Sequence, residues 1–154
     1  MDKKLIAEGR PAEIMLVDDN RGDALLASHA FRESSVQTNL TVASTGEMAL
    51  AMLAGEGEYR GQRLPDLIML DLGLPKMGGV EVLERIKSDI RFRHIPVIVM
   101  SNSGAGSNIL KSYQLHANAY VMKPADLQKF REAISLIEQF FFLLACVPSQ
   151  NIDA

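Results

Sequence analysis

The chain has 154 residues, of which 47% are hydrophobic, a formal net charge of -3 and a single cysteine, Cys146. This length is typical of one globular domain, the slightly acidic charge argues against binding to nucleic acid phosphates, and one cysteine excludes an intrachain disulfide. The first ten residues lack an apolar signal core, and the longest apolar run, residues 140–147, is too short for the about 20 residues that span a bilayer. We therefore expect a cytoplasmic protein that binds neither membranes nor nucleic acids.

The first half of the chain alternates short apolar runs with polar capping sequences. Residues 1–11 predict a flexible lead, and residues 14–17 (IMLV) predict a strand that ends abruptly at Asp18, Asp19 and Asn20. A helix to about residue 34 follows, with Asp23 in its first turn, where negative charge suits the helix dipole. Residues 40–43 predict a second strand and 44–53 a second helix. Residues 55–65 (GEGEYRGQRLP) predict a long exposed loop.

The second half repeats this alternation. Residues 67–70 (LIML), 97–100 (VIVM) and 119–122 (AYVM) predict three strands, and helices are expected at 79–90, at 109–115 and from about 125 onward. Five successive strand–helix units indicate an α/β protein with a parallel sheet covered on both faces. We expect one domain over residues 12–147 and a tail over 148–154.

Polar side chains stand where four of these strands end: Asp18 and Asp19, Asp71, Ser101 and Lys123. The carboxyl ends of parallel strands lie at one edge of a sheet, which is where open α/β sheets bind ligands. These side chains should therefore converge, although they span more than a hundred positions. Taken singly, each has a simpler explanation: the aspartates as a helix cap or a turn acid, the serine as a loop residue and the lysine as a surface residue.

The types of side chain that converge suggest phosphoryl chemistry. Neighbouring carboxylates repel one another unless a hard cation such as Mg²⁺ neutralises them. With the cation bound, Asp71 could attack a phosphoryl group as a nucleophile and form an aspartyl-phosphate. Lys123 could then balance charge on the phosphoryl oxygens, and Ser101 could donate a hydrogen bond to one of them. We therefore expect Asp71 to be the phosphorylation site.

Four motifs resemble those of two-component response regulator receiver domains of the CheY-like type: LVDDN (16–20), MLDLGLPKMGG (69–79), VIVMS (97–101) and YVMKP (120–124). The resemblance implies a flavodoxin-like (βα)₅ fold, a doubly wound parallel sheet with strand order 2-1-3-4-5. It also implies that a partner histidine kinase phosphorylates Asp71 with the help of Mg²⁺ (or Mn²⁺). Asp19, Asp71 and the main-chain carbonyl of Gly73 would then ligate the metal directly, and Asp18 would act through water.

The same resemblance assigns roles around the phosphoryl group. Ser101 and Tyr120 match the hydroxyl and aromatic switch pair, although Tyr120 alone could equally be a core residue. Lys123 matches the phosphate-binding lysine, and the Lys123–Pro124 bond matches a cis peptide of the family. Such a protein would be a phosphoacceptor in signalling and no enzyme, beyond self-phosphorylation and slow autodephosphorylation.

The segments SYQLHANAY (112–120) and IEQFFFLLACVPSQ (137–150) resemble cyanobacterial phytochrome response regulators. That likeness implies a phytochrome-type histidine kinase as partner and a homodimer through the fourth helix, fifth strand and fifth helix. Tyr120, Leu136, Phe140 and Phe142 would lie in the dimer interface. A core-facing stripe at helical spacing accounts for the other apolar residues of the last helix: Leu127, Phe130, Ile134, Ile137 and Phe141. Alternatively, a monomer could bury some of the remaining apolar residues beneath its own tail.

Three other functions are alternatives to the hypothesis that the protein is a phosphoacceptor. An aspartate-nucleophile phosphohydrolase usually carries a second acid two residues after the nucleophile, where this chain has Gly73. A flavodoxin-like nucleotide or flavin protein needs a phosphate-binding loop after the first strand, where Asp18 and Asp19 would repel phosphate. A receiver-like module that only binds partners would not need the full set of acceptor residues.

Overall fold

The computed structural model describes residues 3–6 and 9–148. Strands and helices alternate along this part of the chain as the sequence predicts. The strands are β1 (Ala12–Val17), β2 (Thr38–Ala43), β3 (Leu67–Leu70), β4 (Val97–Ser101) and β5 (Ala119–Met122). The helices are α1 (Arg21–Arg32), α2 (Gly46–Ala54), α3 (Gly79–Ser88), α4 (Gly106–Gln114) and α5 (Leu127–Gln139), with a 3₁₀ turn η1 (Gly57–Tyr59) and a π-helical turn η2 (Phe140–Leu144). None of the helices in the described ranges has the length and apolar character needed to cross a membrane.

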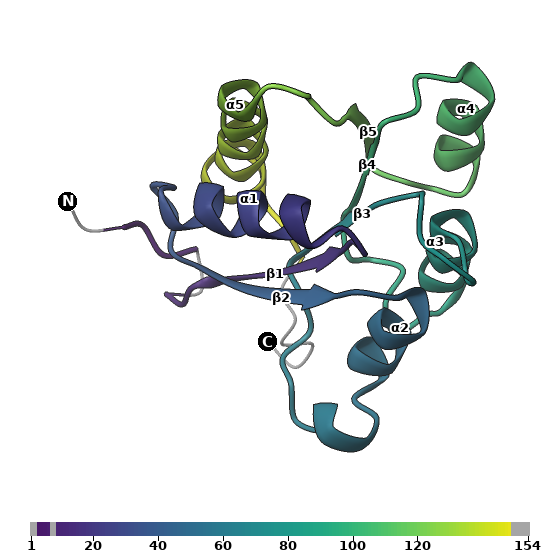
Figure 1. Ribbon diagram of the computed structural model, residues 1–154. Coiled ribbons are helices and arrows are strands. Elements are labelled where there is room, and N and C mark those ends of the chain that lie inside the picture. Colours follow the sequence, from purple (N-terminus) through teal and green to yellow (C-terminus); the bar gives the residue numbers. More distant parts are fainter. Residues whose placement is uncertain (1–2, 7–8, 149–154) are drawn as a thin grey trace.

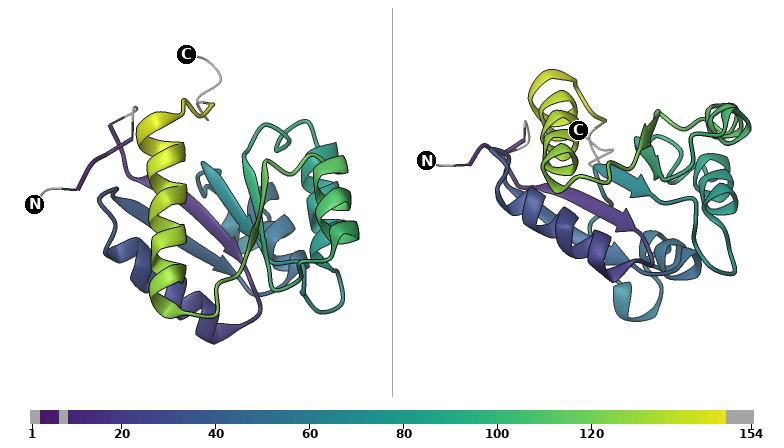
Figure 2. Two further views of the ribbon diagram at one scale, coloured as in Figure 1. Left: turned by 90° about the horizontal axis from the view of Figure 1, so that it is seen from above. Right: turned by 45° about the horizontal axis from the view of Figure 1, so that its top comes forward.

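The strands form one sheet in the order β2-β1-β3-β4-β5, which confirms the expected 2-1-3-4-5 order. All neighbouring strands are parallel. Figures 1 and 2 show α1 and α5 on one face of this sheet, and α2 and α3 on the other. Every residue of β3 and β4 is buried, as expected for strands that are covered on both faces.

The core has two layers, because successive strand residues point to opposite faces of the sheet. Towards α1 and α5, the sheet contributes Ile14, Leu16, Leu67, Met69, Ile98 and Met100. Towards α2 and α3, it contributes Met15, Val17, Ile68, Leu70, Val97 and Val99. The helices α1 and α5 thus cover one face of the central strands, and α2 and α3 cover the other.

The described part of the N-terminal lead is packed, contrary to the expectation of a free segment. Lys4 forms an isolated parallel bridge with Val36, just before β2. Its N–H donates to the Ser35 carbonyl at 2.8 Å, and its own carbonyl accepts from the Gln37 N–H at 2.8 Å. Ile6 is 7% exposed and joins the core layer of α1 and α5. Backbone pairing and one buried side chain together fix this segment.

The end of α5 differs from the sequence prediction. Phe142 is buried, whereas Leu127, expected in the core stripe, is 43% exposed. Phe142 continues the four-residue spacing of the buried residues Phe130, Ile134 and Glu138 into η2, in which the Ala145 N–H donates to the Phe140 carbonyl five residues earlier. Leu127 lies in the first turn of α5, far from η2. The prediction that Phe142 belongs to an exposed dimer interface is therefore wrong.

A buried carboxylic acid, Glu138, lies on the same core-facing side. It has no exposed surface, and neither carboxylate oxygen has a hydrogen-bond partner among the described residues. Burial raises its pKa to about 8, and the positive charge of Lys3 only partly opposes this rise. The sequence gives no sign of this burial, because a glutamate near the end of an amphipathic helix is usually solvated.

Gly79 starts α3 where the chain folds back against the end of β3. A Cβ atom at this position would lie 2.3 Å from the Asp71 carbonyl oxygen and 2.5 Å from the Leu72 Cα atom. Both neighbours are backbone atoms and cannot rotate away. The absence of a side chain at Gly79 therefore allows α3 to begin directly behind Asp71.

Glu138→Gln should weaken the dependence of stability on pH. The folded protein holds the Glu138 proton more tightly than the unfolded chain, so its contribution to stability is present below the unfolded pKa of 4.5 and is lost as the pH rises to about 8. The wild type should lose on the order of 4 kcal/mol relative to the Gln variant over this range. Urea unfolding of both proteins at pH 5 to 8 measures the difference, and parallel pH profiles would contradict the burial of a titrating Glu138.

Gly79→Ala should destabilise the fold by about 2–3 kcal/mol, because an overpacked contact with backbone can be relieved only by moving the chain. Gly78→Ala is the matched control, since a Cβ atom there meets nothing within 4 Å. Chemical unfolding of both variants provides the measurement. Equal stability of the two variants would show that the connection after β3 has room to adjust.

Candidate functional site

The carboxyl ends of the strands meet at one edge of the sheet, as predicted. The pairing of Val17 with Leu70, and of Leu70 with Val99, aligns the ends of the three central strands. Backbone hydrogen bonds continue the alignment into the loops: the Asp71 N–H donates to the Val17 carbonyl at 2.9 Å, and the Lys123 N–H donates to the Ser101 carbonyl at 2.8 Å. The loop residues therefore start from fixed positions.

Three carboxylates gather at this edge. Asp18, Asp19 and Asp71 each offer one oxygen atom, and these atoms lie within 4.8 Å of one another. Asp18 is buried, Asp71 is half-buried and Asp19 is exposed. The Gly73 N–H donates to Asp71 Oδ1 at 3.2 Å, which holds the loop after β3 against the acid. A compact set of oxygen ligands with one open side fits a hard divalent cation such as Mg²⁺ or Mn²⁺.

Lys123 places its ammonium group among carboxylates. Its Nζ atom lies 2.8 Å from Asp18 Oδ2, 2.9 Å from Asp23 Oδ2 and 3.3 Å from Asp71 Oδ2. The lysine side chain is only 6% exposed. Burial alone would lower its pKa, but the hydrogen bonds to Asp18 and Asp23 outweigh burial and raise the pKa above the ordinary value. Lys123 is therefore a permanent positive charge beside Asp71.

Asp23 is a member of this cluster that the sequence analysis did not assign to the site. It lies in the first turn of α1, where Asn20 caps the helix by accepting a hydrogen bond from the Asp23 N–H at 3.0 Å. From this turn, the Asp23 carboxylate accepts a hydrogen bond from Lys123 Nζ at 2.9 Å. The spacing along the sequence could have assigned Asp23 to the site, because a residue in the first helical turn after β1 lies near the edge of the sheet where β1 ends.

Ser101 and Tyr120 are linked through the loop after β4 and not directly. Ser101 is 5% exposed, and its Oγ atom accepts a hydrogen bond from the Ser103 N–H at 3.1 Å. The Tyr120 hydroxyl donates to the Ser103 carbonyl at 2.6 Å. Ser103, which the sequence analysis did not single out, therefore holds both expected switch residues through its two backbone groups.

The Lys123–Pro124 bond is a correction to the sequence prediction. The described residues contain no cis peptide bond, so this bond is trans. The trans isomer is the lower in energy for most X–Pro bonds. The cap of α5, in which Asp126 Oδ1 accepts from the Lys129 N–H at 3.0 Å, starts the helix without a cis bond before it.

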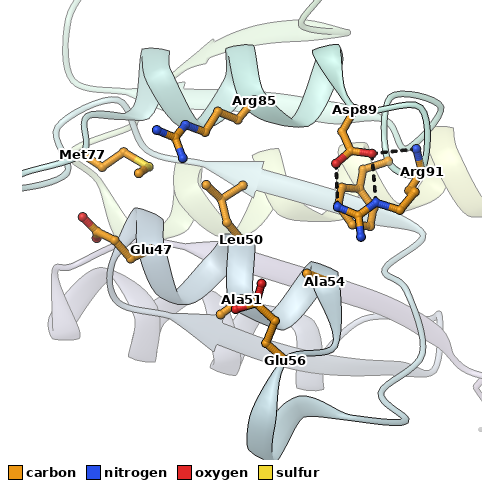
Figure 3. A pocket seen from close by; sticks show the side chains of 10 residues that line it. Glu47, Leu50, Ala51, Ala54, Glu56, Met77, Arg85, Asp89 and Arg91 are labelled. Atoms are coloured by element: carbon orange, nitrogen blue, oxygen red, sulfur yellow. Dashed lines mark hydrogen bonds and ion pairs between the residues drawn. The ribbon is translucent and has the colours of Figure 1, made fainter.

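A groove between α2 and α3 is separate from this edge (Figure 3). Its volume is about 340 Å³, and none of the strand-end residues lines it. Leu50, Ala51 and Ala54 from α2 face Arg85 from α3, and Asp89 pairs with Arg91 at 2.8 Å beside them. The convergent carboxylates and lysine at the sheet edge therefore remain the candidate site.

Comparisons with known proteins agree with this geometry. A model of the response regulator receiver domain matches residues 14–135. The chain is 34% identical over 139 residues to "Response regulator Rcp1" of Synechocystis sp., which covers 90% of this chain and 95% of that protein.

Solved structures give the same result. The phosphorylated cyanobacterial phytochrome response regulator RcpA is 42% identical and superimposes with a TM-score of 0.87, covering 90% of this chain and 99% of that one. The Mn²⁺-bound form of Rcp1 is 34% identical with a TM-score of 0.85, covering 90% of this chain and 100% of that one. The resemblances to receiver domains and to cyanobacterial phytochrome response regulators are thus confirmed. With its strand order and its clustered acids, the chain belongs to the response regulator receiver domain family.

Proposed function

We propose that this protein accepts a phosphoryl group on Asp71 from a phosphohistidine of a sensor histidine kinase. The observation that supports this proposal most strongly is the position of the Lys123 ammonium, which lies 3.3 Å from Asp71 Oδ2 within a cluster of acids. An oxygen of Asp71 would form the new O–P bond as the N–P bond of the phosphohistidine breaks, and the released imidazole nitrogen would take up a proton. Lys123 would then balance the negative charge of the transferred group.

The acidic cluster would hold the divalent cation that this transfer requires. Asp19, Asp71 and the main-chain carbonyl of Gly73 would ligate Mg²⁺ or Mn²⁺ directly, and Asp18 would act through water. The bound cation would supply charge neutralisation on the phosphoryl oxygens. The open side at exposed Asp19 gives the cation a way in. The relative whose structure contains Mn²⁺ supports this assignment.

The loop after β4 would report the phosphorylation. Ser101 Oγ would move to donate its proton to a phosphoryl oxygen, and this movement would strain the hydrogen bond that Oγ accepts from the Ser103 N–H, present here at 3.1 Å. Because the Tyr120 hydroxyl bonds the carbonyl of the same residue, a shift of Ser103 would release or turn Tyr120. The signal would then leave the site on the side of α4 and β5. The protein would act in signalling through such contacts, and not as an enzyme.

The partner we infer is a phytochrome-type histidine kinase. The cyanobacterial phytochrome response regulator RcpA is 42% identical to this chain and covers nine-tenths of its length. The proposed location of this phosphoacceptor is the cytoplasm, where it would meet the kinase.

A second copy of the chain is the other proposed partner. Leu136 is 67% exposed and Phe140 53% exposed on α5 and η2. Further exposed apolar side chains lie on α4, β5 and the start and end of the last helical segment: Leu110, Tyr113, Met122, Leu127, Leu143 and Leu144. Phe141 packs edge-to-face on Phe140 with ring centroids 5.1 Å apart and fixes its position. An apolar face of this kind usually marks a contact surface, and a two-fold dimer that includes Tyr120 is the simplest arrangement.

Incubation with Mg²⁺ and acetyl phosphate should add one phosphoryl group to the protein. Asp71→Asn should abolish the addition, and Asp89→Asn, a substitution at the remote ion pair with Arg91, should leave it unchanged. Removal of the metal with EDTA should also prevent labelling. Intact-mass analysis measures the product, and a folded wild type that takes up no phosphoryl group would overturn the proposal.

The double substitution Leu136→Ser, Phe140→Ser should weaken self-association, because it removes two large exposed apolar side chains from the proposed interface. The control is Ile90→Ser, which alters an apolar residue that is 74% exposed after α3, outside the proposed interface. Sedimentation equilibrium should be measured with and without the phosphodonor. A monomeric wild type under both conditions, or an unchanged dimer of the double variant, would contradict the assigned face.

A further inference from the structure

Lys123 has more carboxylate partners than the proposed phosphoryl transfer requires. A lysine ammonium has three donors, and here its neighbours are Asp18 at 2.8 Å, Asp23 at 2.9 Å and Asp71 at 3.3 Å. The contacts with Asp18 and Asp23 are hydrogen bonds, whereas the contact with Asp71 is a longer ion pair. In this state the proposed phosphoacceptor is therefore the weakest partner of the lysine.

A phosphoryl group on Asp71 would need one of these donors. The three carboxylates differ in how easily they could release it. Asp18 is 3% exposed, so the loss of the ammonium would leave its buried charge compensated only by the Asn20 N–H and by the proposed water-mediated contact with the cation, which is costly. Asp23 is 30% exposed, so water could replace the ammonium at little cost. Asp23 is thus the partner that Lys123 can leave.

The backbone keeps Asp23 in place for this role. Its N–H donates to the side-chain oxygen Oδ1 of Asn20, and the next N–H, that of Ala24, donates to the Asn20 carbonyl. Both hydrogen bonds hold the first turn of α1 at Asp23. The Asp18 side chain accepts from the Asn20 N–H at 2.9 Å in the same turn. One capping turn therefore positions the buried carboxylate and the releasable carboxylate around a single lysine.

We infer that Asp23 is a positioning residue that holds Lys123 while Asp71 is unmodified and releases it to the phosphoryl group. This inference rests on the proposed phosphorylation of Asp71. Asp23 competes with the phosphoryl oxygens for one donor, so it lowers the affinity of the site for a phosphoryl group and favours the unmodified state. It acts through the lysine, and it is not among the acids whose oxygens cluster for a cation.

The test uses the full chain with Mg²⁺ and beryllium trifluoride, which mimics a phosphoryl group on a carboxylate. Asp23→Asn should bind beryllium trifluoride about fivefold more tightly than the wild type, the size expected for one competing, partly exposed charge-assisted hydrogen bond. Isothermal titration calorimetry measures the affinity. Glu33→Gln, at the opposite end of α1, is the control and should match the wild type.

Two further measurements separate release of the lysine from simpler effects. In a Lys123→Met background, Asp23→Asn should give no gain, whereas a general loss of negative charge would give the same gain. Mg²⁺ affinity should change by less than about twofold in Asp23→Asn, and a tenfold loss would make Asp23 a metal ligand instead.

The outcomes also distinguish this inference from the function on which it rests. Equal or weaker binding of beryllium trifluoride by a folded Asp23→Asn, with normal binding by the wild type, would overturn only the role of Asp23. Equal binding by wild type and Asp71→Asn would overturn the phosphoacceptor role, and the inference with it.

Discussion

The site depends on a single ammonium group held among acids at the edge of a parallel sheet. Without Lys123, the side chains of Asp18, Asp23 and Asp71 would place like charges close together, with Asp18 almost fully buried. The lysine compensates them, and their hydrogen bonds in turn keep it charged. The three contacts of the ammonium group are unequal, because the contact with Asp71 is the longest. Lys123 therefore holds Asp71 less closely than it holds Asp18 or Asp23.

The fold fixes this arrangement through backbone contacts. The ladder between β1, β3 and β4 sets where the acids emerge, and the close approach of Gly79 to the Asp71 carbonyl places α3 behind the phosphoacceptor. The Asp23 side chain is partly exposed, and the loop that contains Ser103 is joined to Ser101 and Tyr120 by single hydrogen bonds. These are also the parts that would have to move if the phosphoryl group recruited Lys123 and Ser101. The sheet therefore holds the acids in place, while the contacts of Asp23 and Ser103 can change when the phosphoryl group arrives.

The strands and most of the candidate site could be predicted from the sequence alone, because apolar runs and the polar residues that end them are local patterns. Leu67–Leu70 and Ala119–Met122 were predicted with the observed bounds, since each is an apolar run ended by a polar or charged residue. The convergence of Asp18, Asp71 and Lys123 followed from the parallel topology.

The features that escaped prediction depend on contacts between distant segments. The π-helical turn and the burial of Phe142 and Glu138 depend on packing of the end of α5. Asp23 was recognised only as a helix-terminal charge, because its partner lies 100 residues away. The pairing of Lys4 with Val36 is likewise invisible in a charged N-terminal sequence.

A crystal structure of the protein with Mg²⁺ and beryllium trifluoride would show where Lys123 lies when Asp71 carries a phosphoryl mimic. We expect a beryllium atom on Asp71, Lys123 Nζ within hydrogen-bond distance of a fluorine, the contact with Asp18 retained and the contact with Asp23 broken. An occupied Asp71 with Lys123 still bound between Asp18 and Asp23 would contradict this expectation.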